Sequence, residues 1–214
     1  MAAERLQQGT PVDFAEKNKW VREIADGMKH IAGKHIVHRD LAARNVMVSS
    51  SGSCKIADFG LARVMKTKRK QRGADNDEIY ESYYRAHSSY FPVRWTAPEG
   101  VKEKRFSSSS DVWSFAIVVV EIWQDGRKPY PDKNNRAVRS ALEVDPNFMH
   151  PNVGCKDNLY SLMQDCWNQA PARRPSFAQI VQRLKDAEGD LKGDSTVGAD
   201  LFDDDGYAKP TVTI

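Results

Sequence analysis

The chain has 214 residues, 40% hydrophobic and 29% charged, which are ordinary proportions for a globular protein with a buried core. Its net charge of +3 is too small to indicate nucleic acid as a partner, and its three cysteines form no CxxC pair, which favours a reduced intracellular setting over a disulfide scaffold. Residues 1–10 lack the apolar core of a signal peptide, and the longest apolar run, within 112–123, is too short to cross a membrane.

Hydrophobic spacing predicts a long helix near the start of the chain. Residues 10–13, Thr-Pro-Val-Asp, have the pattern of a helix start, with a capping hydroxyl, a proline and an early acid. Apolar residues from Trp20 to Ile31 then recur on one face, and Gly33 marks the end. The following stretch 45–60, NVMVSSSGSCKIADFG, predicts two short strands around a Ser/Gly turn.

The second half of the chain is mostly helical by the same criteria. Residues 66–90 are polar and irregular, so we expect a long surface loop there. Ser110 is the predicted cap of a buried helix that begins at Asp111 and ends at Gly126. Further helices are predicted at 134–142, 156–168 and 176–188. Residues 189–214 carry acids, glycines and few large apolar side chains, and are predicted to form a flexible acidic tail.

Two short motifs between the first helix and the surface loop carry the chemistry. Asp40, at the end of an HRD tripeptide, is followed by Asn45 five residues later, and a DFG tripeptide begins at Asp58. Phosphoryl transfer needs a positioned nucleophile, held metal ions and neutralised charge. Asp40 is suited to orient a hydroxyl and accept its proton, and Asn45 and Asp58 offer the hard oxygen ligands that Mg²⁺ prefers.

In this order and spacing the motifs resemble those of protein kinases, with a catalytic loop at 38–45 and an activation segment at 58–99. Ala97-Pro98-Glu99 is similar to the motif that closes the segment, and residues 111–115 to the start of the central helix. Residues 166–177 resemble the C-terminal C-W-x-x-x-P-x-x-R-P-x-F pattern. The resemblance implies an ion pair between Glu99 and Arg174. It implies structural roles for His38, Arg39, Phe59, Gly60, Glu99, Asp111 and Arg174.

Three features of the sequence resemble tyrosine kinases in particular. Ala42 stands where serine/threonine kinases usually have lysine, and the cation appears as Arg44 instead. Residues 91–95, FPVRW, resemble the shelf that supports a substrate tyrosine, with Pro92 and Trp95 as its main side chains. Residues 79–85 look like an insulin-receptor-type activation loop with one residue deleted. The candidate phosphorylation sites are Tyr80, Tyr83, Tyr84 and Tyr207.

The family resemblance implies an α+β fold, predominantly α-helical, with a small β-hairpin after the catalytic loop. It implies a protein tyrosine kinase that transfers the γ-phosphate of ATP to tyrosine hydroxyls of proteins or peptides. The catalytic residues would be Asp40, Arg44 and Asn45. ATP and Mg²⁺ would be bound by Asn45, Met47 and Asp58. Phosphate on the loop tyrosines would pair with Arg39 and order the loop.

The ends of the chain raise two further expectations. Tyr207 follows three aspartates, and residues 212–214 end in a free carboxylate after alternating apolar residues. These features would suit phosphotyrosine-binding and C-terminus-binding partner modules, although a plain tail explains them equally well. The expected location is the cytoplasm, or the cytoplasmic part of a membrane receptor.

Part of the kinase pattern has no counterpart in the sequence. None of the thirteen glycines forms a Gly-x-Gly, and no Val-Ala-x-Lys string occurs. Residues 1–188 therefore resemble the larger C-terminal lobe alone, and we expect the isolated chain to be nearly inactive, with Met47 and Phe59 exposed as an apolar patch. Three hypotheses stay open: a kinase whose N-terminal lobe lies upstream, a non-catalytic module that docks substrates or competes with a kinase, and a remnant without a stable fold.

Overall fold

The computed structural model describes residues 1–7, 12–65, 67–69, 78–80, 83–86, 91–145 and 148–193. Within these ranges the fold is α+β and predominantly helical, as the sequence predicts. None of the described helices is long and apolar enough to cross a membrane. The predicted helix cap Thr10, the phosphorylation candidate Tyr207 and the C-terminal residues 212–214 lie outside the described residues.

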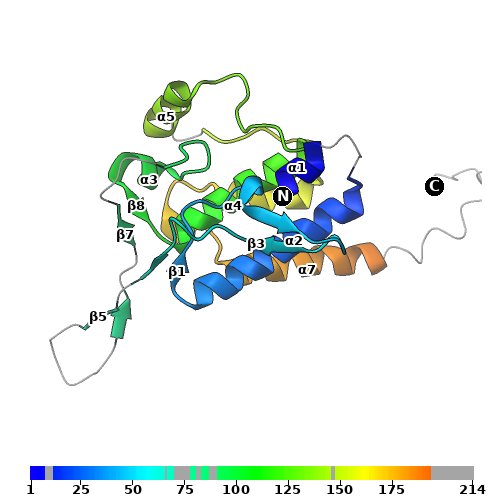
Figure 1. Ribbon diagram of the computed structural model, residues 1–214, viewed down its shortest axis with the longest axis horizontal. Coiled ribbons are helices and arrows are strands. Elements are labelled where there is room, and N and C mark those ends of the chain that lie inside the picture. Colours follow the sequence, from blue (N-terminus) through cyan, green and yellow to red (C-terminus); the bar gives the residue numbers. More distant parts are fainter. Residues whose placement is uncertain are drawn as a thin grey trace, which may run out of the picture.

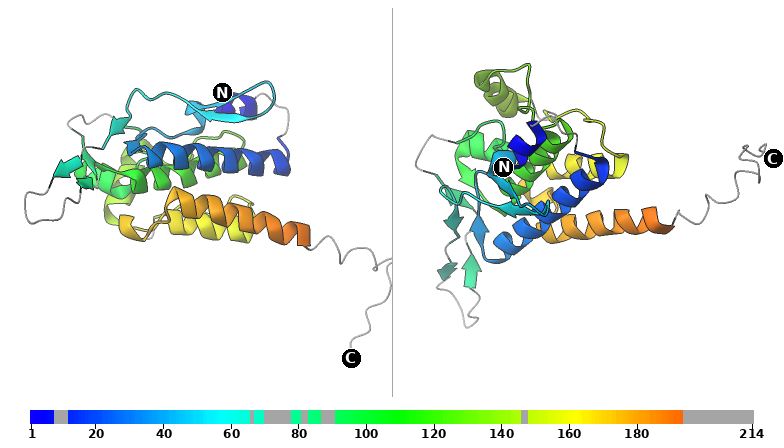
Figure 2. Two further views of the ribbon diagram at one scale, coloured as in Figure 1. Left: turned by 90° about the horizontal axis from the view of Figure 1, so that it is seen from below. Right: turned by 45° about the vertical axis from the view of Figure 1, so that its right-hand side comes forward.

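Four helices form the centre of the core. They are α2 (Phe14–Gly33), α4 (Ser108–Trp123), α6 (Asp157–Cys166) and α7 (Phe177–Gly193). Helix α4 is central: every residue from Ser110 to Trp123 is buried, and the helix contacts both α2 and α6. Helix α7 packs along α2, and the two run side by side in Figure 2. The apolar run of the sequence is thus a buried helix, as expected.

The other helices and the strands surround these four helices. The helices are α1 (Ala2–Gln7), α3 (Pro98–Glu103) and α5 (Asn135–Val144), with 3₁₀ turns η1 (Ala43–Asn45) and η2 (Pro171–Arg173). The strands are β1 (Ile36–Val37), β2 (Val46–Val48), β3 (Cys54–Ile56), β4 (Arg63–Val64), β5 (Thr67–Arg69), β6 (Glu78–Tyr80), β7 (Tyr84–Arg85) and β8 (Arg105–Phe106). They pair antiparallel as β1–β4, β2–β3, β5–β6 and β7–β8, so no sheet among the described residues exceeds two strands.

The predicted hairpin after the catalytic loop is confirmed as β2–β3. Val46 pairs with Ile56 and Val48 with Cys54, and the turn between them contains Gly52 at φ +73°. Glycine adopts this left-handed backbone without a steric cost, which explains the Ser/Gly signal in the sequence. The Ala57 N–H also donates to the Asn45 carbonyl at 2.8 Å, so the hairpin closes directly on the end of the catalytic loop.

Two predicted helix starts were wrong. Helix α2 begins at Phe14 with Asp13 as its cap, since the Asp13 carboxylate accepts the Glu16 N–H at 2.7 Å. Helix α4 begins three residues earlier than expected, because Ser107 is the cap and Ser110 occupies the third helical position of a capping box. In a run of four serines, composition alone does not show which residue caps the helix, since each is an acceptable cap.

The other boundaries differ by a few residues. Helix α4 ends at Trp123 and not at Gly126, whose N–H instead donates to the Glu121 carbonyl at 2.7 Å. Helix α7 continues to Gly193 and so includes the first residues of the predicted tail, whose remainder, 194–214, is outside the described residues. The loop predicted over 66–90 contains the short strands β5, β6 and β7, and Figure 1 shows the β5 hairpin projecting away from the helices.

Candidate active site

The catalytic loop lies between β1 and β2, and its backbone is held by a buried carboxylate on α4. Asp111 accepts the His38 N–H at 2.7 Å and the Arg39 N–H at 3.0 Å. Arg39 has φ +69°, a left-handed conformation that needs such support in a residue other than glycine. Burial raises the pKa of Asp111 to about 7, and the two N–H donors oppose that rise. Asp111 therefore supports the loop, as the resemblance implied.

His38 connects the catalytic loop to the segment that contains Asp58. Its Nε2 lies 3.2 Å from the Ala57 carbonyl, its Nδ1 lies 3.4 Å from the Asp40 N–H, and its ring contacts Phe59 at 5.1 Å between centroids. Burial lowers the pKa of His38 below its usual value and so favours the neutral ring. A neutral ring that donates from Nε2 and accepts at Nδ1 satisfies both contacts.

Asp40 stands at the edge of a cavity, paired with a cation. Its carboxylate forms an ion pair with Arg44, and the exposed fraction of its side chain is 16%. The Asn45 side-chain N–H donates to the Asp40 carbonyl at 2.7 Å, and the Arg44 guanidinium lies over the Trp95 ring at 4.5 Å. The structure thus brings together all three predicted catalytic residues and one residue of the predicted shelf.

Asp58 lies just beyond the hairpin, at φ +58°, with its carboxylate accepting the Gly60 N–H at 3.2 Å. Because the Asn45 amide nitrogen is engaged, its side-chain oxygen is left as an acceptor. Among the described residues no group of three or more His, Cys, Asp or Glu side chains forms a metal site. One carboxylate and one amide oxygen do fit Mg²⁺ that is bound together with phosphates and water, which is the usual arrangement for this ion.

The cavity beside Asp40 has a volume of about 610 Å³. Asp40 and Arg44 line it together with the FPVRW segment, which includes Pro92 and Trp95. The first turn of α5 closes the far side. The cavity therefore joins the catalytic loop to the predicted substrate shelf.

Glu121 is a site residue that the sequence reasoning missed. It is buried on α4, and one of its carboxylate oxygens accepts both the Ala43 N–H and the Trp95 indole N–H at 2.8 Å. Burial raises the pKa of Glu121 to about 7, against the effect of these two donors. A glutamate inside a strongly apolar helix signals such a role, because a buried carboxyl needs hydrogen-bond partners.

Arg94 was also missed, and it fixes the shelf to α5. It is buried, and its Nε donates to the Asn135 side chain at 2.8 Å. Its remaining donors reach the carbonyls of Pro129 at 2.7 Å and Tyr130 at 2.8 Å, and also that of Lys133. Four bonds from one guanidinium hold the shelf, the α4–α5 loop and the start of α5 in a single arrangement.

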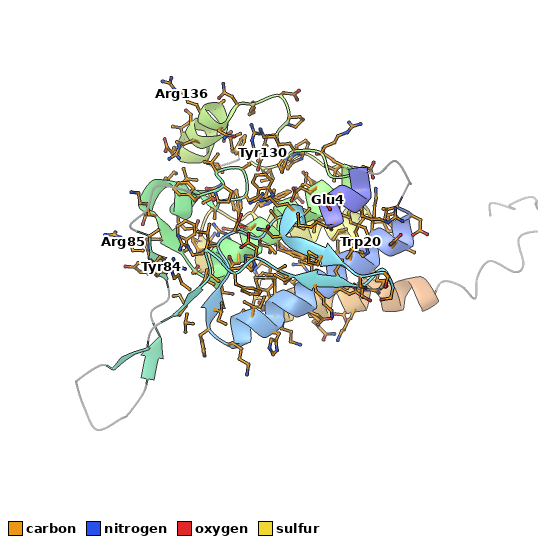
Figure 3. All side chains as sticks on the ribbon, in the orientation of Figure 1. Glu4, Trp20, Tyr84, Arg85, Tyr130 and Arg136 are labelled. Atoms are coloured by element: carbon orange, nitrogen blue, oxygen red, sulfur yellow. The ribbon has the colours of Figure 1, made fainter. Side chains whose placement is uncertain are left out.

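The loop tyrosines differ in their surroundings. Tyr84 is half-buried on β7, beside Arg85 in Figure 3, and the Arg39 guanidinium lies over its ring at 4.8 Å. Arg63 approaches the same ring at 5.9 Å. Tyr83 is exposed and lies under the Arg105 guanidinium at 3.9 Å.

The implied ion pair between Glu99 and Arg174 is present. Two parallel bonds of 2.7 and 2.8 Å join the guanidinium to the carboxylate, and the Arg174 side chain is fully buried. Arg174 also donates to the carbonyls of Ser109 at 2.9 Å and Asn168 at 2.8 Å. The pair therefore ties α3 to the segment that precedes α7.

Comparison with known proteins agrees with this geometry. A family model described as protein tyrosine and serine/threonine kinase matches residues 3–184. The megakaryocyte-associated tyrosine-protein kinase of Mus musculus is 44% identical over 173 residues, which is 81% of this chain and 31% of that protein. The chain belongs to the protein tyrosine kinase family. The match covers most of the sequence and is not limited to the two motifs.

Other tyrosine kinase relatives match a similar share. Ephrin type-B receptor 2 of Gallus gallus is 42% identical over 164 residues, 77% of this chain and 15% of the receptor. Tyrosine-protein kinase FRK of Homo sapiens is 38% identical over 178 residues, 83% of this chain and 33% of that kinase. The chain spans a third or less of the length of each of these relatives.

Proposed function

We propose that this chain provides the catalytic and substrate-binding part of a tyrosine kinase that transfers the γ-phosphate of ATP to tyrosine hydroxyls of proteins. The observation that carries the proposal is the shared cavity, in which the Asp40–Arg44 pair lies next to Trp95 and Pro92. A tyrosine ring supported on this shelf would present its hydroxyl to the Asp40 carboxylate.

Each residue has a distinct task in this proposal. Asp40 orients the tyrosine hydroxyl and accepts its proton as the bond to phosphorus forms. Arg44, stacked on Trp95, offers a cation to the transferred phosphate. Glu121 holds Ala43 and Trp95 at fixed positions, so that the shelf and the loop keep the geometry that transfer needs.

Asn45 and Asp58 would hold Mg²⁺ together with ATP. When bound, the ion neutralises charge that develops during transfer. Met47 lies on β2, two residues after Asn45, and is 47% exposed. It would form the floor under adenine.

Regulation by phosphorylation would centre on Tyr84. A phosphate there adds about −1.5 to −2 charges next to Arg39 and Arg63, both of which already face its ring. Tyr83 and Tyr80 are secondary candidates, and Tyr80 is described only as part of β6. The proposed division into a kinase lobe, 1–188, and a tail, 189–214, with Tyr207 and residues 212–214 as binding sites for partner modules, remains a prediction.

We place this domain in the cytoplasm, either in a soluble kinase or in the cytoplasmic part of a receptor. All three cysteines are free thiols, which is typical of a reducing compartment. Burial raises the pKa of Cys54 to about 12 and raises that of Cys166 further, so both thiols stay protonated and unreactive.

The test of the proposed function is phosphate transfer from Mg·ATP to a tyrosine peptide, with mass spectrometry locating the phosphate. The assay uses the chain alone and the chain joined to the N-terminal kinase lobe of a relative. We expect the chain alone to be about 10²–10³-fold slower or worse, because a charge-stabilising wall of the site is supplied by that lobe. In the joined protein, Asp40→Asn should abolish transfer.

The matched control is Asp26→Asn, which removes an exposed carboxylate from α2. This variant should keep full transfer. A joined protein whose transfer survives Asp40→Asn, or which shows none at all, would contradict the proposal.

A docking module is the second candidate function. It is favoured by one observation: Pro92 and Trp95 of the predicted shelf already line one cavity together with Asp40 and Arg44. This function would be supported if the chain binds peptide but transfers no phosphate, either alone or joined to the N-terminal lobe of a relative.

A further inference from the structure

A second cavity lies between the start of α2, the first half of α6 and the second half of α7. Its volume is about 590 Å³, within the range of about 300–1,000 Å³ that ligand-sized sites occupy. We call it the α2–α6–α7 groove, and none of its lining residues also lines the cavity beside Asp40. The groove is therefore a separate site, which the proposed phosphate transfer does not use.

The apolar part of this groove includes an aromatic ring in solvent. Phe14 is 43% exposed, although its ring packs edge-on against Trp123 at 6.0 Å between centroids. Leu159 and Leu162 of α6 are buried beside the groove, and Leu184 of α7 is half-buried. The groove thus combines leucines that belong to the core with a ring that another apolar side chain can still cover.

Positive charge lines the same groove. Among the described residues, Arg22, Lys156 and Arg183 line it together with a single carboxylate, that of Asp186. Arg183 already pairs with Asp165 at 2.6 Å, whereas no carboxylate in the described part of the chain forms an ion pair with Lys156. The Lys156 ammonium lies instead over the exposed aromatic ring of the groove at 5.6 Å. A peptide segment with an apolar centre and acidic flanks would therefore match the groove.

The start of α6 contributes to this charge. Lys156 is the N-cap of α6, and its side chain does not cap the helix. The backbone N–H groups at a helix start carry partial positive charge, which favours a nearby carboxylate. Because Asp157 already supplies one acid in the first turn, this field adds to the charge of Lys156 and is not a site by itself.

The chain contains a segment of the matching kind shortly after α7. Residues 200–205 read Asp-Leu-Phe-Asp-Asp-Asp, so two large apolar side chains stand between four aspartates. From Asp194 to Asp205 the sequence has five acids and no lysine or arginine. We call residues 200–205 the acidic segment; it lies outside the described residues. Its order of charged and apolar side chains is the one that the groove requires.

Helix α7 leads the chain to the groove. Residues between Arg183 and Ala187 line the groove, and the helix ends at Gly193. Figures 1 and 2 show α7 ending at the same end of the molecule at which α2 begins. The six residues from Ala187 to Gly193 rise only about 9 Å as a helix, whereas the eight from Gly193 to Leu201 can span up to about 29 Å. The acidic segment can therefore turn back and reach the groove of its own chain.

We propose that the acidic segment docks in the α2–α6–α7 groove of the same chain, with Leu201 and Phe202 against its apolar side chains and the aspartates beside Lys156. The inference goes beyond the proposed function, because it assigns the predicted tail a binding site on the kinase domain that needs neither ATP nor Asp40.

The test is binding of a labelled peptide of residues 198–206 to the full-length chain, followed by fluorescence anisotropy. The tail variant, Leu201→Ser with Phe202→Ser, keeps the groove but removes the apolar centre of the acidic segment. In wild type the tethered segment competes at an effective concentration of about 1 mM, which is ten times a peptide Kd of about 0.1 mM. The tail variant should therefore bind the peptide about tenfold more tightly than wild type, a difference of about 1.4 kcal/mol.

The deciding substitutions are added to the tail variant. Lys156→Glu with Ser161→Glu places two acids at exposed positions that line the groove, and should weaken peptide binding at least about tenfold by charge repulsion. The matched control is Lys55→Glu with Ser50→Glu, which makes the same change of charge at exposed positions of the β2–β3 hairpin, outside the groove. The control should bind the peptide as tightly as the tail variant does.

Three results would contradict the proposal. Peptide that binds neither wild type nor the tail variant, or binding that survives the groove substitutions, would overturn it. Equal binding to wild type and the tail variant would show that the chain's own segment does not occupy the groove. A difference between these two proteins that grows with protein concentration would assign the docking to a second copy of the chain and overturn docking within one chain.

Discussion

At the scale of single residues, the least conventional feature is a carboxyl group in the most apolar helix of the molecule. Glu121 has no ion-pair partner among the described residues and is held instead by two N–H donors, from Ala43 and Trp95. Burial disfavours its charged form more than these donors favour it, which is why its pKa is raised to about 7. Its charge state, and with it the stability of the site, should therefore depend on pH near neutrality.

The sign of that dependence follows from linkage. The unfolded chain releases the Glu121 proton near the ordinary value of 4.5, whereas the folded chain keeps it until about pH 7. Stability is then full below pH 4.5 and falls as pH rises to 7. Relative to Glu121→Gln, which does not titrate, wild type should lose up to about 3 kcal/mol of unfolding free energy between pH 4.5 and 8.

Urea unfolding of both proteins at pH 5 and pH 8 measures this difference. The comparison cancels the contributions of the other titrating groups to the pH dependence. These groups include His38 and His150, whose pKa values burial lowers. A difference in unfolding free energy between the two proteins that does not change with pH would show that Glu121 is charged throughout the range.

At the scale of secondary-structure elements, the Glu99–Arg174 pair decides how α3 is attached. Helix α3 is only six residues long and has no side-chain cap at its start, so it cannot be stable by itself. Arg174 supplies the attachment through Glu99 and through the carbonyl of Ser109 at the start of α4, and its guanidinium also lies over the Trp113 ring at 5.1 Å. One buried cation thus holds two helices on the core.

Removing one partner of this pair should be costly. In Glu99→Ala the fully buried Arg174 loses its counter-charge, and we expect about 3–5 kcal/mol of destabilisation. The matched control is Glu103→Ala, which removes the exposed partner of Arg105 at 3.0 Å and should cost at most about 1 kcal/mol. Thermal unfolding of both variants gives the comparison. Equal shifts in Tm would mean that the buried pair contributes no more than a surface pair.

At the scale of the whole molecule, one face is left with large apolar side chains in solvent. Met47 and Phe59 are each 47% exposed and Val64 is 67% exposed, as the sequence predicted for the first two. These residues belong to the hairpin, the DFG segment and β4, and Met47 and Asp58 of the first two are proposed to hold the nucleotide and its metal ion. A face of this kind is typical of a surface that another domain or molecule covers.

The chain alone should therefore self-associate through this face. Sedimentation analysis should show a mean mass that rises with protein concentration, and the variant Met47→Ser with Phe59→Ser should reduce that rise. Val144→Ser is the control, because Val144 is 75% exposed but lies on α5, outside this face. Association that is unchanged in the double variant would show that the chain self-associates through another surface.

Some local patterns were predicted correctly from neighbouring residues alone. The periodic apolar residues of α2 and the Ser/Gly turn of the β2–β3 hairpin are examples, because helix faces and tight turns depend on residues a few positions apart. The cap of α4 could not be resolved in the same way. Ser107 is the cap because it forms a reciprocal capping box with Ser110, and a run of serines does not single out that pair.

The sequence by itself determined the family and predicted the residues with chemical roles, since HRD, DFG and the FPVRW shelf are short strings with fixed spacing. Only the tertiary structure decided what surrounds them. Glu121 meets Ala43 across 78 positions and Trp95 across 26, and Arg94 meets the α5 start across 41. Contacts over such separations depend on how α4 and α5 pack against the loop, and no local periodicity encodes that packing.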